Sequence, residues 1–486
     1  MTLRSAVTPR RQATPTRAFV ISVVNAFVTK LGTIGIGIAL ARLLGPEEFG
    51  TYAVAFIALV AVLSFNELGV SLAIVRWPGD PKEIAATVTT ISVTCSVLLF
   101  GISYAVAPLF TAAMGNEAAT DVVRALAFCI VLNGLVATPA ALLQRNFRQG
   151  QRMVIDQVNV WLGAGVSLLL VIAGMGAMSL AVGRVLASLV AGVLFLVYSP
   201  LPYRFGFSLQ SAKKLLVFGL PLAGASAVVF AVGYVDQLIA GRMLGPVTLG
   251  LYVMATNMAG WPASLLSQPL RSVAPATFSR LQGSPEDMRR SMLRILAVVG
   301  AVMLPVSCVL AASAAPVVTV LYGEEWAAAA VALSWLAPVA VCKVLHELFY
   351  DYLVVLKRSI SILRVQVLSM AALVPALVLG AHFAGLAGVA AAPLLVALAV
   401  TSPLYLGALG RAGLTLDGIL GSIAVSLAVS VVAGAISWAL ATFVGAPLLA
   451  FAGSVLVGMA TMALTVYLRR GDLAALRLLR GEQEQS

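Results

Sequence analysis

Long apolar stretches alternate with short polar gaps along the whole chain. Runs of about twenty apolar residues recur about every thirty-five positions, and a hydrocarbon core about 30 Å thick needs about twenty helical residues to cross it. Because lipid offers backbone groups no water, each run must close its own hydrogen bonds as a helix. The pattern predicts an all-α polytopic membrane protein with about 14 transmembrane helices, and twelve is the alternative count. The predicted spans are residues 18–43, 50–75, 84–110, 121–143, 153–174, 178–200, 214–241, 248–275, 290–320, 328–350, 360–383, 386–409, 417–443 and 446–468.

The basic residues lie mostly in every second gap between these runs. On one side of the membrane lie 25 of the 31 lysines and arginines, whereas the gaps on the other side hold only Arg42, Arg124 and Arg242. Short cytoplasmic loops carry such an excess of basic residues. We therefore expect a multi-pass protein of the bacterial cytoplasmic (inner) membrane, with both termini in the cytoplasm. The net charge of +12 then indicates contact with anionic membrane lipids and not with nucleic acid.

Composition excludes several classes of protein. Hydrophobic residues make up 61% of the 486 positions and charged residues only 10%, whereas soluble globular domains are about 25% charged. All four cysteines fall within apolar runs, where they act as small hydrophobic residues, so neither a disulfide framework nor a metal site is expected. The sequence lacks the glycine-rich phosphate loop that an ATP-driven exporter would need. No cofactor is expected.

Two segments two hundred positions apart have closely similar sequences. Residues 42–55 and 242–255 are identical at seven of fourteen positions, and both contain Gly-Pro followed by Gly-x-Tyr. Glycine and proline in this arrangement indicate a turn that ends one helix and starts the next. Because six spans separate the copies, both begin on the same side of the membrane. The repeat predicts two six-helix lobes related by a pseudo-two-fold axis along the membrane normal, plus two extra C-terminal helices.

These observations divide the chain into six predicted parts. They are a cytoplasmic N-terminal tail (1–17), an N-lobe of six spans (18–200), a cytoplasmic interlobe linker (201–213), a C-lobe of six spans (214–409), the two extra helices (410–468) and a cytoplasmic amphipathic tail (469–486).

The repeated segment also carries a family resemblance. Residues 41–50, with Asn-Glu-Leu-Gly at 66–69, resemble the opening of lipid-linked oligosaccharide flippases and polysaccharide exporters of the Wzx type. Further matching segments are residues 143–148, 236–242, 275–282 and 321–326. The resemblance extends over the first ten spans. It implies the fold of the multidrug/oligosaccharidyl-lipid/polysaccharide exporter superfamily, in which two six-helix lobes enclose a central cavity, and it implies a substrate in which a pyrophosphate joins an oligosaccharide to a polyprenol.

Charged and polar side chains within the spans are the candidates for binding substrate. A charge at membrane depth is costly, so it indicates a hydrated pathway or a buried pair. We expect the following residues to line the central cavity: Asn25, Lys30, Glu67, Arg184, Asp236, Lys343, His346 and Glu347. Lys343, His346, Glu347, Tyr350 and Asp351 recur at spacings of three and four, which places them on one face of a helix.

For some of these residues a second interpretation stays open. Lys343 and Glu347 are spaced for a mutual ion pair, and Arg184 is near enough to the outer end of its span to extend toward lipid headgroups. Asp236 lies close to a helix end, where solvation explains its charge without proton coupling. Lys30 has no acidic residue three or four positions away, which favours a role in the cavity.

The predicted function is translocation of a polyprenol-pyrophosphate-linked oligosaccharide across the membrane by alternating access. Lys30, Arg184 and Lys343 are the cations that we expect to bind the pyrophosphate. The partners would be that glycan, membrane lipids, and glycosyltransferases and a polysaccharide polymerase. The alternatives are a cation-coupled multidrug exporter of the same superfamily and a membrane glycan polymerase or ligase. An enzyme is disfavoured because no predicted outer loop is long enough to hold a catalytic site.

Overall fold

The computed structural model describes residues 15–66 and 70–472, and it describes the side chains of residues 32–65, 70–264, 278–281 and 283–472. Within the described ranges the chain forms helices and no strands. The helices are α1 (Pro15–Asn66), α2 (Val70–Arg76), α3 (Lys82–Ala113), η1 (Glu117–Ala119), α4 (Thr120–Arg145), α5 (Gln149–Ile172), α6 (Ala177–Val197), α7 (Leu209–Arg280), η2 (Leu281–Gly283), α8 (Pro285–Ala312), α9 (Ala314–Tyr322), η3 (Glu324–Trp326), α10 (Ala329–Val355), α11 (Ser359–Val396), η4 (Ala397–Thr401), α12 (Ser402–Gly410), α13 (Leu416–Phe443) and α14 (Pro447–Leu468).

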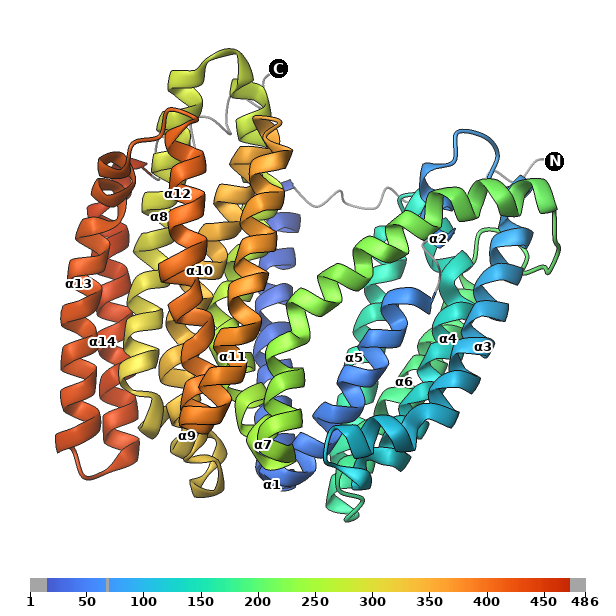
Figure 1. The fold of residues 1–486 in the computed structure, drawn as a ribbon, viewed down its shortest axis with the longest axis horizontal. Helices are drawn as coiled ribbons and strands as arrows, with labels where there is room; N and C mark the ends of the chain where they lie inside the picture. The colour runs from blue at the N-terminus through green and yellow to red at the C-terminus, as the bar shows by residue number, and fades with distance from the viewer. Residues whose placement is uncertain (1–14, 67–69, 473–486) are drawn as a thin grey trace, which may run out of the picture.

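The helices form two bundles that meet at one end and separate at the other (Figure 1). We call helices α1–α6 the N-lobe and helices α7–α12 the C-lobe. The first part of α7 crosses obliquely between them: Leu215 packs in a buried cluster with Val70, Ile84 and Leu142 of the N-lobe, whereas Ala240 packs in a cluster that contains residues of both lobes. The face where the lobes meet is called the closed face below, and the opposite face is called the open face.

Three of the long helices are interrupted by a glycine with a non-helical backbone. Gly45 (φ 71°), Gly245 (φ 83°) and Gly385 (φ 55°) break α1, α7 and α11. Only glycine adopts such positive φ values readily. Among the described residues, eleven helical segments are long and apolar enough to cross a membrane, and these three breaks fall within three of them. Two passes from each interrupted segment would give the fourteen predicted spans.

Left-handed backbone positions recur in the same order in both lobes. Gly45 and Gly245 come first, followed by Gly115 and Gly323. Phe147 (φ 55°) precedes α5 as Lys357 (φ 58°) precedes α11, 210 positions later. Gly176 (φ 53°, ψ −138°) and Gly385 (φ 55°, ψ −131°) follow at a separation of 209. This shared succession of turns is what an internal repeat of six spans predicts, although the exact limits of the lobes stay a prediction.

The two copies of the repeated segment pack directly against each other at the closed face. A β-carbon built at Gly50 would overlap the Pro246 carbonyl oxygen and lie 3.2 Å from Gly250 N. Reciprocally, a β-carbon at Gly250 would overlap the Pro46 carbonyl oxygen and lie 3.2 Å from Gly50 Cα. Glycines without side chains allow helix backbones to approach this closely. The mutual contact also places both copies on the same face, as a parallel repeat requires.

Trp326 of the C-lobe also contacts the N-lobe at the closed face. Its side chain is fully buried in a cluster with Tyr322 and Ala41, and the Phe49 ring of α1 meets it edge-on at a centroid distance of 5.6 Å. The indole Nε1 donates a hydrogen bond of 3.2 Å to the Ala41 carbonyl. One C-lobe side chain therefore binds α1 on both sides of its glycine break.

Helices α13 and α14 lie outside the repeat and flank α8 (Figure 1). Their buried faces are rows of small residues: Ser422, Ser426, Ser430, Gly434 and Ser437 on α13, and Ser454, Gly458, Thr461 and Thr465 on α14. The Thr465 hydroxyl donates to the Ala301 carbonyl of α8 at 2.6 Å. Small and hydroxyl-bearing residues of this kind mediate helix packing in lipid.

Several predicted boundaries differ from the structure. The ninth span, expected to be continuous over 290–320, is divided at Ser313 into α8 and α9. The linker between the lobes is shorter than predicted, because α7 begins at Leu209 and includes Lys213 and Lys214. Charged residues can continue a helix beyond the lipid, so hydropathy alone locates helix ends poorly. The predicted amphipathic tail lies mostly outside the described residues, as does most of the N-terminal tail.

Candidate functional site

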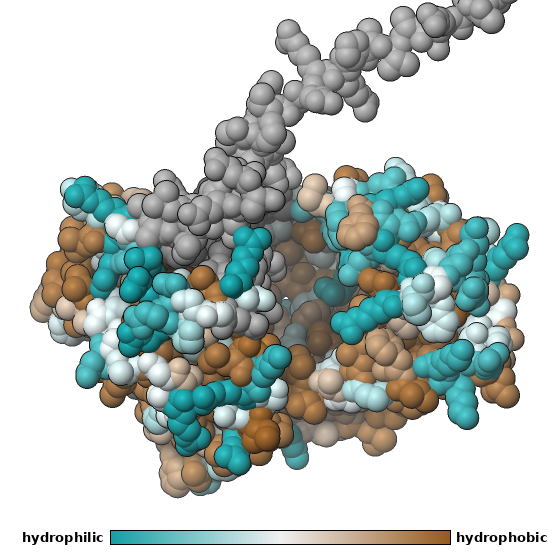
Figure 2. Space-filling model, turned by 90° about the horizontal axis from the view of Figure 1, so that it is seen from above, coloured by the Kyte–Doolittle hydropathy of each residue, from teal (hydrophilic) through white to brown (hydrophobic). Residues whose placement is uncertain are grey.

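A hollow lies between the lobes and is visible from the open face (Figure 2). Hydrophilic side chains surround its rim, and apolar side chains line much of its wall. A cavity of about 420 Å³ lies between α1 and the second part of α7. Thr33 and Gly37 line it from α1, and Thr256, Asn257 and Ser264 line it from α7. The walls of α1 and α7 are thus partly polar where the two lobes adjoin.

A second cavity lies inside the N-lobe and has a volume of about 390 Å³. Helix α2 supplies Ser71, and helices α4, α5 and α6 supply the other polar residues, which are Asn133, Gln144, Arg152, Asp156, Asn159, Arg184 and Ser188. The Arg184 guanidinium packs over the Phe56 ring at 5.0 Å from the ring centroid. Its position is therefore fixed beside the cavity, without requiring a headgroup partner.

Arg152 forms polar contacts within its own lobe. Its guanidinium donates to Gln144 Oε1 at 2.8 Å, and its Nε lies 3.9 Å from Asp156 Oδ2. The Asp156 carboxylate is therefore the nearest described counter-charge of Arg152. Arg184 is left as the main source of positive charge on the cavity wall.

A third cavity lies inside the C-lobe and has a volume of about 460 Å³. One face of α10 forms much of its wall, with the following residues in helical succession: Val339, Cys342, Lys343, His346, Glu347, Tyr350 and Asp351. The last five of these are the predicted polar stripe. Its residues therefore face a cavity and not lipid.

Helices α11, η4 and α12 complete this C-lobe wall. His346 Nε2 lies 2.9 Å from the Ser402 hydroxyl, and its ring stacks on Tyr405 with centroids 5.2 Å apart. The Thr401 hydroxyl donates to Ser369 Oγ at 2.8 Å. Residues 397–401 form a π-helical turn, which the hydropathy pattern does not predict. Such turns are frequent at functional sites, and this one places Ala397 and Thr401 on the cavity wall.

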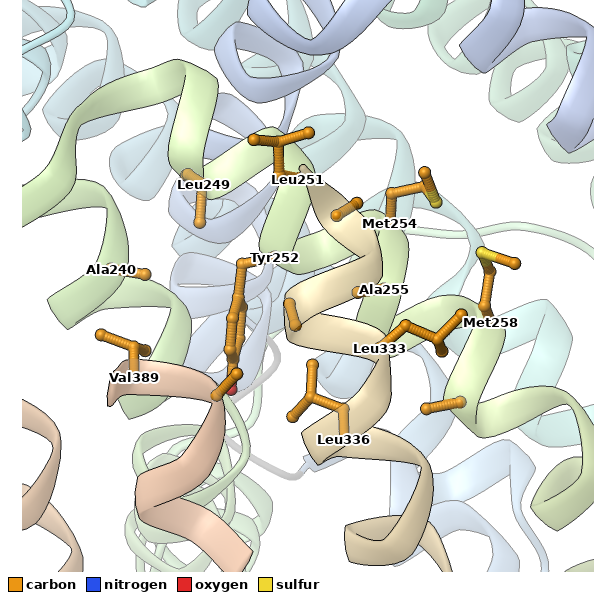
Figure 3. Close-up of a cluster of buried hydrophobic side chains, with 14 of the residues drawn as sticks. Ala240, Leu249, Leu251, Tyr252, Met254, Ala255, Met258, Leu333, Leu336 and Val389 are labelled. Atoms are coloured by element: carbon orange, nitrogen blue, oxygen red, sulfur yellow. The ribbon is translucent and has the colours of Figure 1, made fainter. Parts of the chain in front are cut away.

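Asp236 reaches the same cavity from α7. Its carboxylate accepts a 2.8 Å hydrogen bond from the Tyr252 hydroxyl, and its other oxygen accepts from the Gln237 backbone N–H at 2.8 Å. Tyr252 belongs to the repeated segment and is fully buried beside Ala240, Leu249 and Val389 (Figure 3). Asp236 is thus held in position by a tyrosine of the closed face.

The structure distributes the predicted site residues over two lobes. Asp236, Lys343, His346 and Glu347 line the C-lobe cavity together, whereas Arg184 lines the N-lobe cavity. The expectation of a single cavity holding all of them was therefore too simple. Asn25 and Lys30 belong to α1, but their side chains lie outside the described residues, as does Glu67.

Sequence reasoning missed most of the polar wall of the N-lobe. Arg152 was assigned to a cytoplasmic gap, and Asn133, Gln144 and Asn159 were not among the candidates. Arg152, Asp156 and Asn159 are spaced by four and three residues, so they share a helix face as the α10 residues do. The same test of spacing would have found them.

Comparison with known proteins gives the chain its family. Residues 39–331 match the family described as polysaccharide biosynthesis protein. The chain belongs to this polysaccharide biosynthesis family. The matched range extends from α1 to the start of α10, and it includes both copies of the repeated segment and the whole N-lobe cavity.

Named relatives in this polysaccharide biosynthesis family are distant. The succinoglycan biosynthesis transport protein ExoT of Rhizobium meliloti (strain 1021) is 27% identical over 316 residues, which cover 64% of each chain. The lipopolysaccharide biosynthesis protein WzxC of Escherichia coli (strain K12) is 24% identical over 373 residues, which cover 75% of each chain. The chain therefore spans slightly less than two thirds of the length of ExoT.

Solved structures show the fold of this family member. The lipid II flippase MurJ in an inward closed conformation superposes with a TM-score of 0.74 and 12% identity, covering 94% of this chain and 100% of that chain. An inward-facing multidrug resistance MATE family transporter of the MOP superfamily superposes with a TM-score of 0.59 and 18% identity, covering 79% and 98%. The protein has the MurJ- and MATE-like fold.

Proposed function

We propose that the protein is a flippase that carries a polyprenol-pyrophosphate-linked oligosaccharide across the cytoplasmic membrane by alternating access. The main support is a hollow that is closed at the Gly50–Gly250 contact and open on the opposite face. Polar cavities within both lobes adjoin apolar spans, so a hydrated headgroup has partners at membrane depth. The polyprenol would remain in lipid between helices while the sugars pass through the hollow.

The chemistry of the substrate accounts for the charges on both cavity walls. A pyrophosphate needs cations that bind it loosely enough to release it on the other side, and Lys30, Arg184 and Lys343 are the candidates. His346, Glu347, Asp236, Asn25 and Glu67 are the other residues that we propose for the pathway. Movement of the two lobes about the closed face would expose these residues alternately to the two sides.

A glycan fits the family better as a substrate than a cationic drug does. The family is one of polysaccharide biosynthesis, and ExoT and WzxC are named for succinoglycan transport and lipopolysaccharide biosynthesis. The MATE transporter shares only the fold. Glycosyltransferases that build the glycan on the inner leaflet, and a polymerase that extends it on the outer leaflet, are the expected partners.

Depletion of the protein in its own host tests the proposed function. We expect the polyprenol-linked glycan to accumulate on the inner leaflet, because synthesis continues while translocation stops. The measurement is extraction of the lipid-linked glycan, with its sidedness determined by a membrane-impermeant glycosidase on oriented vesicles. Restoring the wild-type gene is the control. A lipid-linked glycan that stays on the outer leaflet at its normal level during depletion would contradict the proposal.

Labelling of single cysteines tests the proposed orientation. On a background in which the four native cysteines are replaced, cysteine at exposed Glu47 or Glu324 should react with an impermeant maleimide from outside. Cysteine at exposed Arg148 or Ser359 should react only after the membrane is opened. The reason is that the basic residues near these two positions favour the cytoplasm. The reverse pattern of labelling would overturn the orientation.

A further inference from the structure

The cavities of the N-lobe and the C-lobe occupy equivalent positions in the two copies of the repeat. Seven α10 residues line the C-lobe cavity, and the seven α4 residues 210 positions earlier all line the N-lobe cavity. The same separation relates the left-handed residues Phe147 and Lys357, which follow these two helices. On the opposite wall, Arg184 and Ser188 stand 209 positions before Pro393 and Ala397. The two walls can therefore be compared position by position.

The comparison shows that the chemistry of the two cavities has diverged. Where α10 carries Lys343, His346, Glu347, Tyr350 and Asp351, α4 carries Asn133, Val136, Ala137, Ala140 and Ala141. Four of these five α4 residues lack a polar side chain and three are alanines, which leaves space. On α6, Arg184 stands at the position where α11 of the C-lobe carries Pro393. The N-lobe cavity thus combines a wall of small residues with a cation on the facing helix.

The remaining polar groups suit a ligand rich in hydroxyl groups. Asn133, Gln144 and Asn159 supply amides and Ser188 supplies a hydroxyl, and these groups both donate and accept hydrogen bonds. The volume of about 390 Å³ lies within the range of about 300–1,000 Å³ that is usual for small-ligand sites. The charged lining residues that the structure describes are Arg152, Asp156 and Arg184, whose formal charges sum to one positive charge.

We propose that the N-lobe cavity is a subsite for one anionic sugar unit of the transported glycan. Arg184, one of the three cations named above for the pyrophosphate, is here assigned to the anionic group of the sugar unit, and the amides of α4 and α5 bind the neighbouring hydroxyl groups. The Arg184 guanidinium packs over the Phe56 ring, and a guanidinium forms bidentate hydrogen bonds with a carboxylate or a phosphate. This inference rests on the proposed flippase function. It adds that the N-lobe is the lobe that recognises the sugar headgroup.

Binding to the purified, full-length protein in nanodiscs tests the subsite apart from transport. The probes are a glucuronate-containing disaccharide, its neutral glucose analogue and inorganic pyrophosphate, with binding followed by thermal shift and by titration. We expect the glucuronate disaccharide to bind at least tenfold more tightly than its neutral analogue and more tightly than pyrophosphate. A preference for the glucuronate probe assigns the site to a sugar carboxylate, and a preference for pyrophosphate assigns it to the phosphate of the linkage and overturns the sugar-unit assignment.

Two variants make the test specific to the cavity. Arg184→Gln should lower the affinity for the anionic probe about 10- to 100-fold, which is the usual effect of losing a charge-assisted hydrogen bond. Arg184→Lys should recover part of that affinity. Ala140→Leu fills the cavity and should weaken binding while Arg184 remains. Arg124→Gln is the matched control, because Arg124 belongs to the same lobe and pairs with Asp121 outside the cavity. Equal binding by wild type, Arg184→Gln and Ala140→Leu would overturn the proposal.

Export in the host separates this inference from the proposed function. If Arg184→Gln exports glycan as the wild type does while depletion still causes accumulation, the subsite is wrong and the flippase function stands. If depletion causes no accumulation, the function is wrong whatever the binding results are.

Discussion

Gly50→Leu should reduce glycan export at least tenfold while the protein is still inserted in the membrane. Even a β-carbon at this position overlaps the Pro246 carbonyl oxygen, and that oxygen belongs to backbone that cannot rotate away. Overpacking costs about 1–3 kcal/mol, and a larger side chain against backbone lies at the upper end. If the state with this face closed is destabilised by that amount, its population falls about 5- to 150-fold. Alternating access requires that state, so export should fall at least tenfold.

The readout of conformation is the reactivity of a cysteine near the closed face. On the Gly50→Leu background, a cysteine at Glu47 should react faster with an impermeant reagent, because the lobes are held apart there. Gly250→Leu should behave in the same way, since the contact is reciprocal. Gly101→Leu is the control: Gly101 is helical and has no heavy atom within 4 Å of a built β-carbon. Normal export by Gly50→Leu would show that this contact is not part of the transport cycle.

Some of this arrangement could be predicted because local sequence determines it. The polar residues of α10 are spaced by three and four, so they had to share a helix face whatever surrounds the helix. The Gly-Pro turns at Gly45 and Gly245 were likewise predicted, since glycine and proline act on their own backbone. The all-α membrane fold and the family were confirmed by the structure and by the comparisons.

Other features depend on tertiary contacts and could not be predicted in this way. The sequence contains the repeat, but it does not say that Gly50 and Gly250 meet each other. The N-lobe cavity was missed because its wall on α4 consists largely of apolar residues, three of them alanines, which resemble ordinary lipid-facing residues. Arg152 was assigned to a loop by its charge, whereas α5 begins three residues earlier, at Gln149. Space left by small side chains appears only when the facing helices are in place.

The two diverged cavities suggest how an internal repeat acquires an asymmetric function. Duplication supplies two equivalent cavities, and the packing that forms them is retained in both lobes as small-residue contacts and glycine turns. The charged and amide side chains on the cavity walls belong to none of the buried apolar clusters around them, so they are freer to differ than the apolar ones. Among the residues that the structure describes, the N-lobe cavity has one more basic than acidic side chain and several amides, whereas the C-lobe cavity has acidic and basic residues together, with Asp236 fixed by Tyr252.

Replacing Trp326 with alanine should strongly destabilise the protein. The side chain is fully buried, packs edge-on against Phe49 and donates to the Ala41 carbonyl across the lobe interface. Truncation of a buried tryptophan typically costs about 3–5 kcal/mol. Because the lost contacts hold the closed face, Trp326→Ala should lower the apparent Tm in detergent and also reduce export by favouring separation of the lobes.

Two further substitutions divide this effect into its parts. Trp326→Phe keeps an aromatic ring but leaves the Ala41 carbonyl without its donor, so it should cost about 1 kcal/mol and retain most of the export. Trp438→Ala is the control for aromatic truncation, because Trp438 on α13 is 57% exposed and lies outside the repeat. Thermal unfolding should rank Trp326→Ala well below Trp326→Phe, and Trp326→Phe below Trp438→Ala. Equal unfolding temperatures for Trp326→Ala and Trp438→Ala would mean that the Trp326 indole does not stabilise the contact between the two lobes.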